Sequence, residues 1–455
     1  MSSNKTSIPA YTAKLADIVC AKGYDVLDHD AITAVKRLIL DGVAVAIAGT
    51  AEDAPKIVAA HTREGGGMPQ ATVWGCGYKT TASAAAYANA VSMHVLDFEP
   101  MSSPPTHAVS PVVPVALALA EAQGGNGQEV IAACAKGFEI QGRILAAAKP
   151  ARGALPFHSP GVMGPMGSAV TAAHMLKLDA AQLANALGMA SSRCAGLPAN
   201  SGSMAKSTHC GNAAAAGLEA ALLAARGFTA NPAIFEAKHG YVQTFFAPHF
   251  DYDVLFGFGT PWRCVEPGMA IKFYPSKYPT HFAITAALEA RKTIKAVSEL
   301  KSVRIVSPEI LDANRPRPRV GLEGKFSIQY AAAAALLDGA VGIQTFTDAR
   351  RFATDMESLL GKIVLDFDKN IPPDTKNMHM TVEVTLVDGS VHTGVCHKPP
   401  GTWGEVIDEA QHRAKISDCL RVRFDADKTA RVIVAFETLE TLSTSQLQAL
   451  LELLA

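Results

Sequence analysis

The sequence has few charged residues and no long hydrophobic run. Charged residues make up 18% of the 455 positions, and the formal net charge is −1. Nucleic-acid binding needs a basic surface that displaces counterions from phosphates, and neither the overall balance nor any Lys/Arg run supplies one. No uninterrupted apolar run reaches the roughly 18 residues of a membrane-spanning helix. The richest segment, Pro111–Ala122, is broken by proline and glutamate. We therefore expect neither a nucleic-acid partner nor a membrane span.

Several targeting and cofactor signals are also missing. The N-terminus lacks the basic and then apolar layout of a secretory signal. Neither a GxxxxGK loop nor a GxGxxG after a strand is present, so nothing predicts a nucleotide cofactor. The cysteines form no CxxC pair, which argues against a zinc ribbon or an iron–sulfur cluster. Scattered cysteines in a long chain indicate reduced thiols in a cytoplasmic protein. They are Cys20, Cys76, Cys134, Cys194, Cys210, Cys264, Cys396 and Cys419.

Alanine-rich segments with helical periodicity dominate the chain from residue 10 to about residue 265. Alanine has a high helix propensity, and small residues let neighbouring helices approach closely. Strand-like patterns are nearly absent from this part, apart from Ala71–Gly75. We predict helices over residues 30–47, 82–96, 109–122, 127–148, 164–176 and 204–226.

The pattern changes after Trp262. Residues 302–307 and 362–367 alternate as strands do. Two further alternating segments, 381–387 and 390–396, flank Asp388-Gly389, which is a strong hairpin signal. Helical stretches over 280–295 and 327–337 alternate with the first of these strands, and the tail from residue 403 is helical again.

These patterns predict a mainly α protein with an inserted α/β domain. A large all-helical domain is built from both chain ends, and a smaller α+β domain forms a lid. The expected boundaries are 1–268 for the first part of the helical domain, 269–400 for the lid, and 401–455 for the C-terminal helices that return to the helical domain. A chain of 455 residues is too long for one ordinary core, which agrees with this division.

The first of four chemically interesting segments runs from His94 to His107. It follows an apolar helix and contains Asp97 and Glu99 before a proline-broken loop. A carboxylate beside an imidazole fixes its tautomer and raises its basicity, as general bases require. The alternative is an ordinary helix-end contact and a solvent-exposed loop histidine.

The second segment opens a helix that runs through Ala173. His158 precedes a glycine-rich turn with Gly161, Gly164 and Gly167. Glycines beside a helix N-terminus expose backbone N–H groups that suit an anion. Ordinary helix capping is the alternative interpretation.

The third segment places Lys206 in the first turn of a helix whose later residues are mostly small. His209 lies three residues further on and therefore on the same side of the helix. Lys206 either projects into water or lies in a cleft.

The fourth segment, at the boundary between the helical and α/β parts, contains Lys272, Tyr274 and Lys277. Clefts between domains commonly hold small-molecule sites, and a cationic, aromatic segment there suits a carboxylate ligand.

Taken in order, these segments resemble the MmgE/PrpD family. The resemblance rests on HVLDFE followed by His107, on FHSPGVMG, on GSMAKxxHxGxAAxxGL, on IKFYPSxYxTH, and on NRP…FSIQY within Asn314–Tyr330. It implies a homodimer with a site between the two domains and no metal or cofactor. It also implies catalytic roles for Asp97, His107, His158, Lys206 and Lys272, and we expect His209, Tyr274 and Lys277 to bind substrate.

The family resemblance predicts a lyase or isomerase acting on a small di- or tricarboxylate. Lys206 and Lys272 would hold carboxylates, and His107 or His158 would move a proton with Asp97 orienting one imidazole. Dehydration of the 2-methylcitrate type is the leading expectation, and epimerisation or decarboxylation of iminodisuccinate-like or cis-aconitate-like acids is the alternative. The decarboxylase branch has a threonine where this chain has Met101 and a tyrosine where it has Asp312.

Two other functions stay open at this point. Asp97, Glu99 and His107 form an oxygen-rich set that suits a divalent ion in a metal-dependent hydrolase. Against it, Pro100 and the following Pro-Pro pair do not give a helical ligand face. The second possibility is a dimeric binding protein without catalysis.

Overall fold

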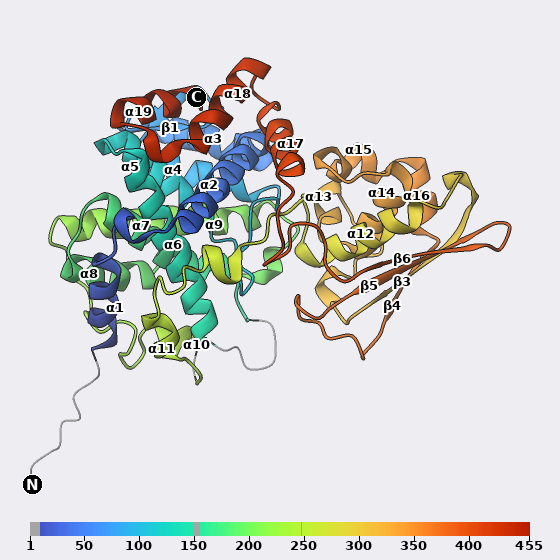
Figure 1. Ribbon diagram of the computed structural model, residues 1–455, viewed down its shortest axis with the longest axis horizontal. Coiled ribbons are helices and arrows are strands. Elements are labelled where there is room, and N and C mark those ends of the chain that lie inside the picture. The colour runs from blue at the N-terminus through green and yellow to red at the C-terminus, as the bar shows by residue number, and fades with distance from the viewer. Residues whose placement is uncertain (1–9, 149–154, 247) are drawn as a thin grey trace, which may run out of the picture.

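The computed structural model describes residues 10–148, 155–246 and 248–455. The expectation that the N-terminus carries no secretory signal concerns partly the first nine residues, which lie outside the described residues. Two hydrophobic clusters divide the described chain. One is built from buried residues up to Ile271 and from Ile416 onward, and the other comes almost wholly from Ala270 to Cys396. Figure 1 shows the corresponding two bodies, a large helical one and a smaller one that carries the sheet.

The larger body, called the helical body below, consists mainly of helices. A small hairpin of β1 (Ala71–Val73) and β2 (Tyr78–Thr80) lies within it. Its helices are α1 (Tyr11–Cys20), α2 (His29–Gly49), α3 (Asp53–Gly65), α4 (Ala82–His94), α5 (Val113–Gln123), α6 (Gly127–Ala147), α7 (Ser159–Met175), α8 (Ala180–Ser191), α9 (Ala205–Ala225), α10 (Tyr241–Phe246), α11 (Tyr252–Phe256), α17 (Glu409–Leu420), α18 (Ala426–Glu437) and α19 (Thr444–Leu453).

Local sequence signals set where the helices begin. Thr81 caps α4 by accepting a hydrogen bond from the Ala84 N–H, and Asn126 forms a capping box with Glu129 at the start of α6. Such caps satisfy N–H groups that have no partner inside the helix, and each stabilises its helix by about 1 kcal/mol. The helices predicted from alanine-rich periodicity therefore lie close to their expected positions.

The glycine-rich segment after His158 differs from its prediction. The helix α7 begins at Ser159, so Gly161, Gly164 and Gly167 lie inside it and are buried. A Cβ atom at Gly161 would overlap the Ala195 carbonyl oxygen. The prediction of a glycine-rich turn is therefore wrong, because these glycines lie inside α7 and allow neighbouring segments to pack closely against it. Anion binding at the start of the helix stays a prediction.

The smaller body, called the lid below, has a four-stranded sheet in the order β4-β3-β5-β6. The β3–β4 pair is parallel, and β5 is antiparallel to both β3 and β6. Its strands are β3 (Leu300–Ser307), β4 (Ile363–Phe367), β5 (Met380–Leu386) and β6 (Val391–Cys396), and its helices are α12 (Tyr278–Arg291), α13 (Gly321–Gly324), α14 (Ile328–Asp338), α15 (Asp348–Arg351) and α16 (Thr354–Leu360).

The predicted hairpin is present between β5 and β6. Gly389 adopts φ of 86°, which its turn position requires and which glycine accepts without strain. Residues of β5 alternate between buried and partly exposed, so one face of the sheet is covered. The covering helix is α12, where the Gly394 position approaches the backbone of Ala286 and leaves no room for a side chain.

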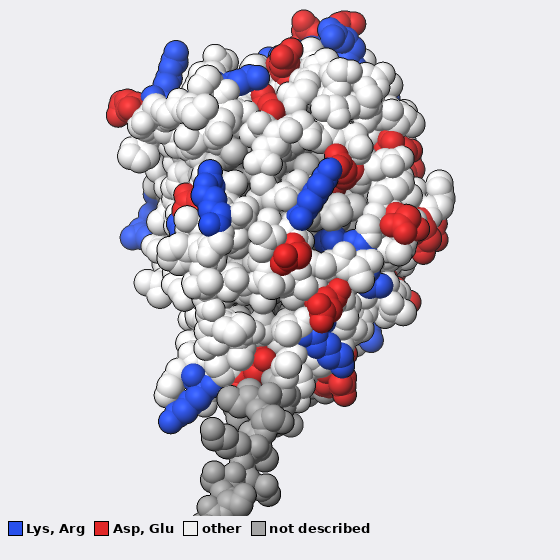
Figure 2. All heavy atoms as spheres, turned by 90° about the vertical axis from the view of Figure 1, so that its left-hand side faces the viewer, with Lys and Arg blue, Asp and Glu red and all other residues white. Residues whose placement is uncertain are grey.

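The chain returns to the helical body after the lid. The helix α17 packs on α2, while α19 packs on α5 (Figure 1). The prediction of a mainly α protein with an inserted α/β domain is thereby confirmed. Among the described residues, no helix combines the length and the apolar character needed to cross a membrane. On the face of the helical body farthest from the lid, charged side chains are sparse and both signs are interspersed (Figure 2).

Candidate active site

The site is centred on a sharp loop that follows α4. The backbone of Asp97 has φ of 52°, and its N–H donates to the His94 carbonyl at 3.0 Å. A residue with a Cβ pays about 1–2 kcal/mol for this left-handed conformation. Such strain persists only where the surroundings impose it, and it is concentrated at functional sites. The conformation turns the Asp97 carboxylate toward the boundary between the helical body and the lid.

Two lysines bind the Asp97 carboxylate from different elements. Lys206, in the first turn of α9, donates to Oδ2 at 2.8 Å. Lys272, at the boundary with the lid, contacts Oδ1 and also donates to the Asp97 carbonyl at 2.5 Å. Asp97, Lys206 and Lys272 are each more than nine-tenths buried, counted over the whole residue. Lys206 is therefore not the solvated helix-end lysine of the alternative interpretation.

Glu99 links the loop to two imidazoles. Its Oε1 lies 2.6 Å from His94 Nδ1 and 2.9 Å from His107 Nδ1, the second contact being out of line for a hydrogen bond. His94 Nε2 lies 2.9 Å from the Lys206 ammonium. Because that ammonium can only donate, Nε2 accepts and Nδ1–H donates to Glu99. The neutral tautomer of His94 is thus set by its two partners.

The buried charges compensate one another. Burial by itself would raise the pKa of Asp97, but Lys206 and Lys272 hold that pKa well below its ordinary range. Burial would likewise raise the pKa of Glu99, and His107 and His94 reverse that effect. Burial, reinforced by Lys206, lowers the pKa of His94 to about 3. At neutral pH the site therefore holds two carboxylates and a neutral His94.

His158 and His209 complete the cluster on the side of α7 and α9. Their Nδ1 atoms lie 3.0 Å apart, so one ring donates a hydrogen bond to the other. Burial, together with Lys206, lowers the pKa of both imidazoles. The ring of His158 lies 5.6 Å from that of His94 and 6.3 Å from that of His107, centroid to centroid.

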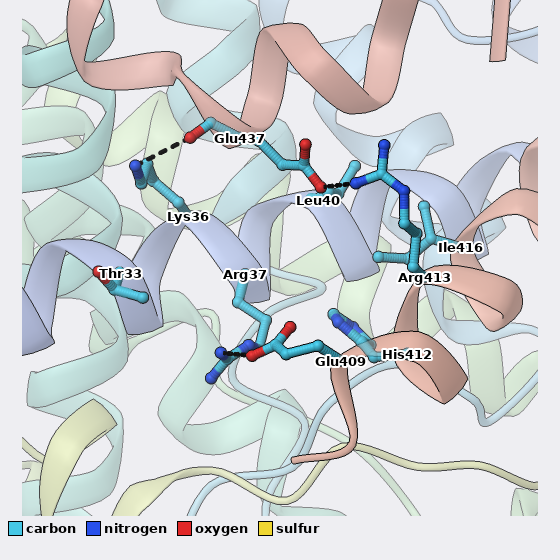
Figure 3. A pocket seen from close by; sticks show the side chains of 9 residues that line it. All are labelled: Thr33, Lys36, Arg37, Leu40, Glu409, His412, Arg413, Ile416 and Glu437. Carbon is cyan, nitrogen blue, oxygen red and sulfur yellow. Dashed lines mark hydrogen bonds and ion pairs between the residues drawn. The ribbon is translucent and has the colours of Figure 1, made fainter. Parts of the chain in front are cut away.

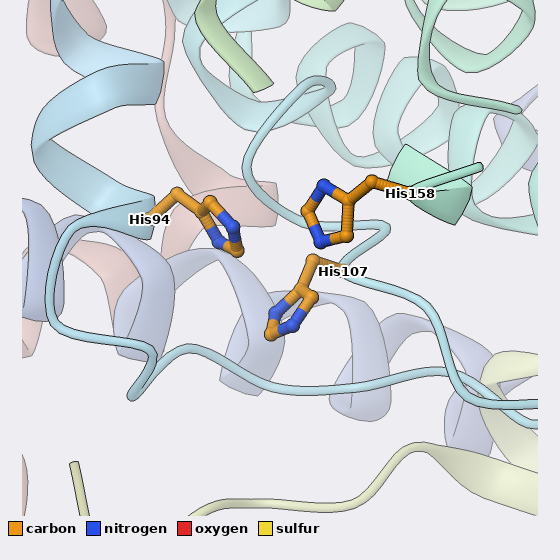
Figure 4. Close-up of side chains that lie close together, drawn as sticks. All are labelled: His94, His107 and His158. Atoms are coloured by element: carbon orange, nitrogen blue, oxygen red, sulfur yellow. The ribbon is translucent and has the colours of Figure 1, made fainter. Parts of the chain in front are cut away.

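Three of these imidazoles also satisfy the spacing of a metal site. One nitrogen each from His94, His107 and His158 lies within 4.8 Å of the others, and the rings converge from α4, a loop and the start of α7 (Figure 4). However, His94 Nε2 already accepts from the Lys206 ammonium. A cation there would compete with a fixed positive charge. The predicted hydrolase set fits less well, because both oxygens of Asp97 are held by lysines.

The cavity at Asp97 and Lys206 is small in this structure. The space open to water-sized molecules measures about 20 Å³ and is lined on the lid side by Leu322 and Phe326. About 10–15 Å³ of such space holds one water, so a tricarboxylate enters only when the side chains that line the cavity move. The Phe326 ring centroid lies 5.5 Å from Lys206 Nζ, in cation–π range.

The structure brings most of the predicted residues together. Asp97, His107, His158, Lys206, Lys272 and His209 form the cluster described above. Tyr274 instead packs on His281 in the lid, and Lys277 pairs with Asp312 near the lid surface. Their substrate-binding roles stay predictions.

His94 and Glu99 were underrated by the sequence analysis. The sequence pattern indicated Glu99 as one of two acids near a histidine and as a metal ligand, but not as a partner of His94, which only marked the start of the segment. An imidazole and a carboxylate five residues apart at the end of an apolar helix could have indicated the pair.

The two departures from the decarboxylase pattern also have structural correlates. Met101 is buried and pairs its backbone with Ala270, and the Asp312 side chain is 70% exposed.

Comparison with known families covers nearly the whole chain. The model of the MmgE/PrpD N-terminal domain matches residues 13–253, and that of the MmgE/PrpD C-terminal domain matches residues 274–441. The first match includes every cluster residue except Lys272, which lies in the short segment between the two matches.

Several characterised relatives are named as cis-aconitate decarboxylases. The protein of Homo sapiens is 31% identical over 85% of this chain and 83% of its own length. The protein of Mus musculus is 29% identical over 90% of this chain and 86% of its own length. The protein of Aspergillus terreus is 25% identical over 86% of this chain and 85% of its own length.

Proposed function

The chain belongs to the MmgE/PrpD family, and from that premise we propose that it is a carbon–carbon lyase which removes carbon dioxide from a small unsaturated tricarboxylate of the cis-aconitate type. The names of the relatives favour this reaction over the dehydration that the sequence motifs led us to expect first. The observation that carries the proposal is the continuous buried network in which Lys206 contacts both Asp97 and His94, and His94 contacts Glu99.

The chemistry of such a substrate matches the groups in the network. When the carboxylate on the methylene carbon leaves as carbon dioxide, its bonding electrons form a new double bond. The former double bond shifts and leaves a carbanion beside a remaining carboxylate. One proton is then taken up at that carbon, so the product is a dicarboxylate with a terminal methylene group. The reaction needs cations at the remaining carboxylates and a proton donor.

The side chains can supply both needs. Lys206 and Lys272 are the cations, and a substrate carboxylate would take over part of their pairing with Asp97. Each aligned donor to a developing oxyanion contributes a factor of about 10²–10³ in rate. His107 is the proton donor in this proposal, because its Nδ1 lies at Glu99 while its Nε2 lies on the Asp97 side, 3.7 Å from Oδ1.

Lid movement is part of the proposed cycle. Leu322 and Phe326 leave a cavity of about 20 Å³ beside Asp97 and Lys206. Closure over a bound acid excludes water from the carbanion and strengthens the contacts of the lysines with charge. That the chain forms a homodimer and is cytoplasmic stays a prediction; light scattering after size exclusion tests the first.

The experiment is incubation in deuterium oxide with citrate, methylcitrate, cis-aconitate and iminodisuccinate. The expected result is release of carbon dioxide from cis-aconitate and one deuterium in the methylene group beside the product carboxylate, read by NMR. Water loss from methylcitrate with no carbon dioxide from cis-aconitate would return dehydration as the function. Deuterium incorporation into iminodisuccinate together with formation of its stereoisomer would indicate epimerisation.

A further inference from the structure

Three successive backbone carbonyl groups of the Asp97 loop each accept a hydrogen bond from a buried lysine. We call Lys272, Lys325 and Lys415 the lysine cradle. Their bonds are Lys325 Nζ to Leu96 O at 3.1 Å, Lys272 Nζ to Asp97 O at 2.5 Å, and Lys415 Nζ to Phe98 O at 3.0 Å.

The cradle is assembled from three distant parts of the chain. Lys272 lies at the domain boundary, Lys325 follows α13 in the lid, and Lys415 lies in α17. Their relative exposures are 0%, 2% and 7%. Burying an ammonium group costs several kcal/mol unless it finds strong partners. The concentration of three such groups on one short loop therefore indicates a role for the loop.

The loop needs external partners for two reasons. It leaves the C-terminal end of α4, where carbonyl groups no longer have a partner within the helix. It then passes through the left-handed conformation of Asp97. Cationic donors suit helix C-termini, where the carbonyl dipoles concentrate negative charge. The three ammonium groups thus satisfy carbonyls and hold a strained turn.

We propose that Lys325 and Lys415 are positioning residues, which hold the Leu96–Phe98 backbone so that Asp97 and Glu99 face Lys206 and the imidazoles. The proposal rests on the proposed function, because it assigns these lysines to the geometry of that reaction. Neither lysine touches the cluster of reacting groups directly. Their effect passes through the backbone from which Asp97 and Glu99 project.

Lys325 also couples the loop to the lid. The Lys325 ammonium belongs to the lid, and the Leu96 carbonyl belongs to the helical body. This hydrogen bond therefore forms only when the lid packs against the helical body. Among the described residues, no carboxylate forms an ion pair with Lys325; its ring contact is with Phe346, 5.4 Å from the centroid. Burial lowers the pKa of Lys325 to about 8. Seating of the lid therefore completes the loop at the moment when the cavity closes.

Lys415 anchors the loop to the helical body through Asp41. The Lys415 ammonium lies 2.7 Å and 2.9 Å from the two Asp41 oxygens, and His412 contacts the same carboxylate at 2.9 Å. His412 also lines a pocket of about 340 Å³ between α2, α17 and α18. The lysine and the two arginines that line this pocket already contact Glu409 or Glu437 (Figure 3), so we assign the pocket no ligand.

Lys325→Met is the decisive variant, because it leaves no paired carboxylate behind. Lys362→Met is the control for loss of a lysine that donates to a backbone carbonyl, since the exposed Lys362 donates to the Leu300 carbonyl at 2.9 Å within the lid and away from the loop. We expect kcat to fall about tenfold to hundredfold in Lys325→Met, because a displacement of about 1 Å at a reacting group costs that much. We expect KM to change less than about threefold, whereas the control keeps both.

Hydrogen exchange provides a readout that needs no substrate. The amides of Asp97 and Met101 donate to His94 and Ala270, so a peptide covering them reports on the loop. We expect faster exchange there in Lys325→Met and unchanged exchange in the control. Lys415→Met leaves the buried Asp41 with His412 alone and is expected to fold poorly. The double variant Asp41→Asn/Lys415→Met removes both charges, so its kcat and loop exchange are measured to test the role of Lys415.

The outcomes separate the two proposals. Wild-type kcat and wild-type loop exchange in Lys325→Met would overturn the positioning role. A lowered melting temperature with unchanged kcat per folded molecule and unchanged loop exchange would also overturn it, since that result describes a purely structural lysine. If the wild-type protein turns over no acid of the panel, the proposed function fails, and loop exchange alone decides whether the cradle holds the loop.

Discussion

Glu99 and His94 are joined by a 2.6 Å hydrogen bond between Oε1 and Nδ1, and both side chains are fully buried. This bond directs His94 Nε2 toward Lys206, and the same Glu99 oxygen contacts His107. One carboxylate thereby orients the His94 ring by a hydrogen bond and lies in contact with the His107 ring.

Glu99→Gln is therefore expected to lower kcat at least about hundredfold, the usual contribution of a positioned acid or base. An amide accepts the His94 N–H less strongly than a carboxylate does, carries no charge beside His107, and can present a donor where an acceptor is needed. Steady-state kinetics on the acid that is turned over measures this. Glu121→Gln is the control, because only 3% of the Glu121 side chain is exposed. Its carboxylate accepts hydrogen bonds from Thr72, away from the loop. Equal rates in both variants would remove Glu99 from the mechanism.

Lys206→Met and Lys272→Met should each lower kcat/KM at least about hundredfold, because each removes a donor to developing negative charge. Lys398→Met is the control for loss of a positive charge, since Lys398 pairs with Glu405 near the surface. Retained activity in both site variants would exclude the proposed role of the lysines.

His94→Asn should make the free energy of unfolding less dependent on pH in the acid range. The pKa of His94 is lowered from 6.5 to about 3 in the folded protein. The unfolded chain therefore binds one more proton than the folded chain between these values. The His94 contribution is fully present above pH 6.5 and is lost as the pH falls toward 3. Removing it reduces the slope of unfolding free energy by up to about 1.4 kcal/mol per pH unit.

Urea titrations at several pH values measure that slope, with exposed His61→Asn as the control. An unchanged slope in His94→Asn would show that His94 does not titrate in this way.

Gly217→Ala should destabilise the packing of α7 on α9. A Cβ there would overlap the Ala169 backbone nitrogen and the Ser168 side chain. Overpacking of this kind costs about 1–3 kcal/mol. At Gly65 nothing lies within 4 Å of a new Cβ, so Gly65→Ala is the matched control. Equal thermal stability of the two variants would contradict the close approach of these helices.

Treatment with EDTA should leave the rate unchanged, because the Lys206 ammonium occupies the Nε2 side of His94. A loss of activity that zinc or another divalent ion restores would instead assign a metal to His94, His107 and His158. Kinetics before and after dialysis distinguishes these results.

Much of the architecture follows from local sequence. Alanine-rich periodicity predicts helices such as α2, α6 and α9 because helix propensity and capping act over a few residues. Asp388-Gly389 predicts the β5–β6 hairpin because its turn requires a positive φ that glycine accepts. The order of the motifs also indicates the family and most of the polar residues of the site.

Tertiary packing decided which of those residues meet. Asp97 lies 109 positions from Lys206 and 175 positions from Lys272, so no local pattern reports their contacts. The left-handed turn at Asp97 and the burial of His94 depend on elements packed around them. The glycines after His158, which were predicted to form a turn, lie inside α7, where neighbouring segments pack closely against them. Local propensities come from neighbours in the chain, whereas the pairing and titration of a buried group depend on neighbours in space.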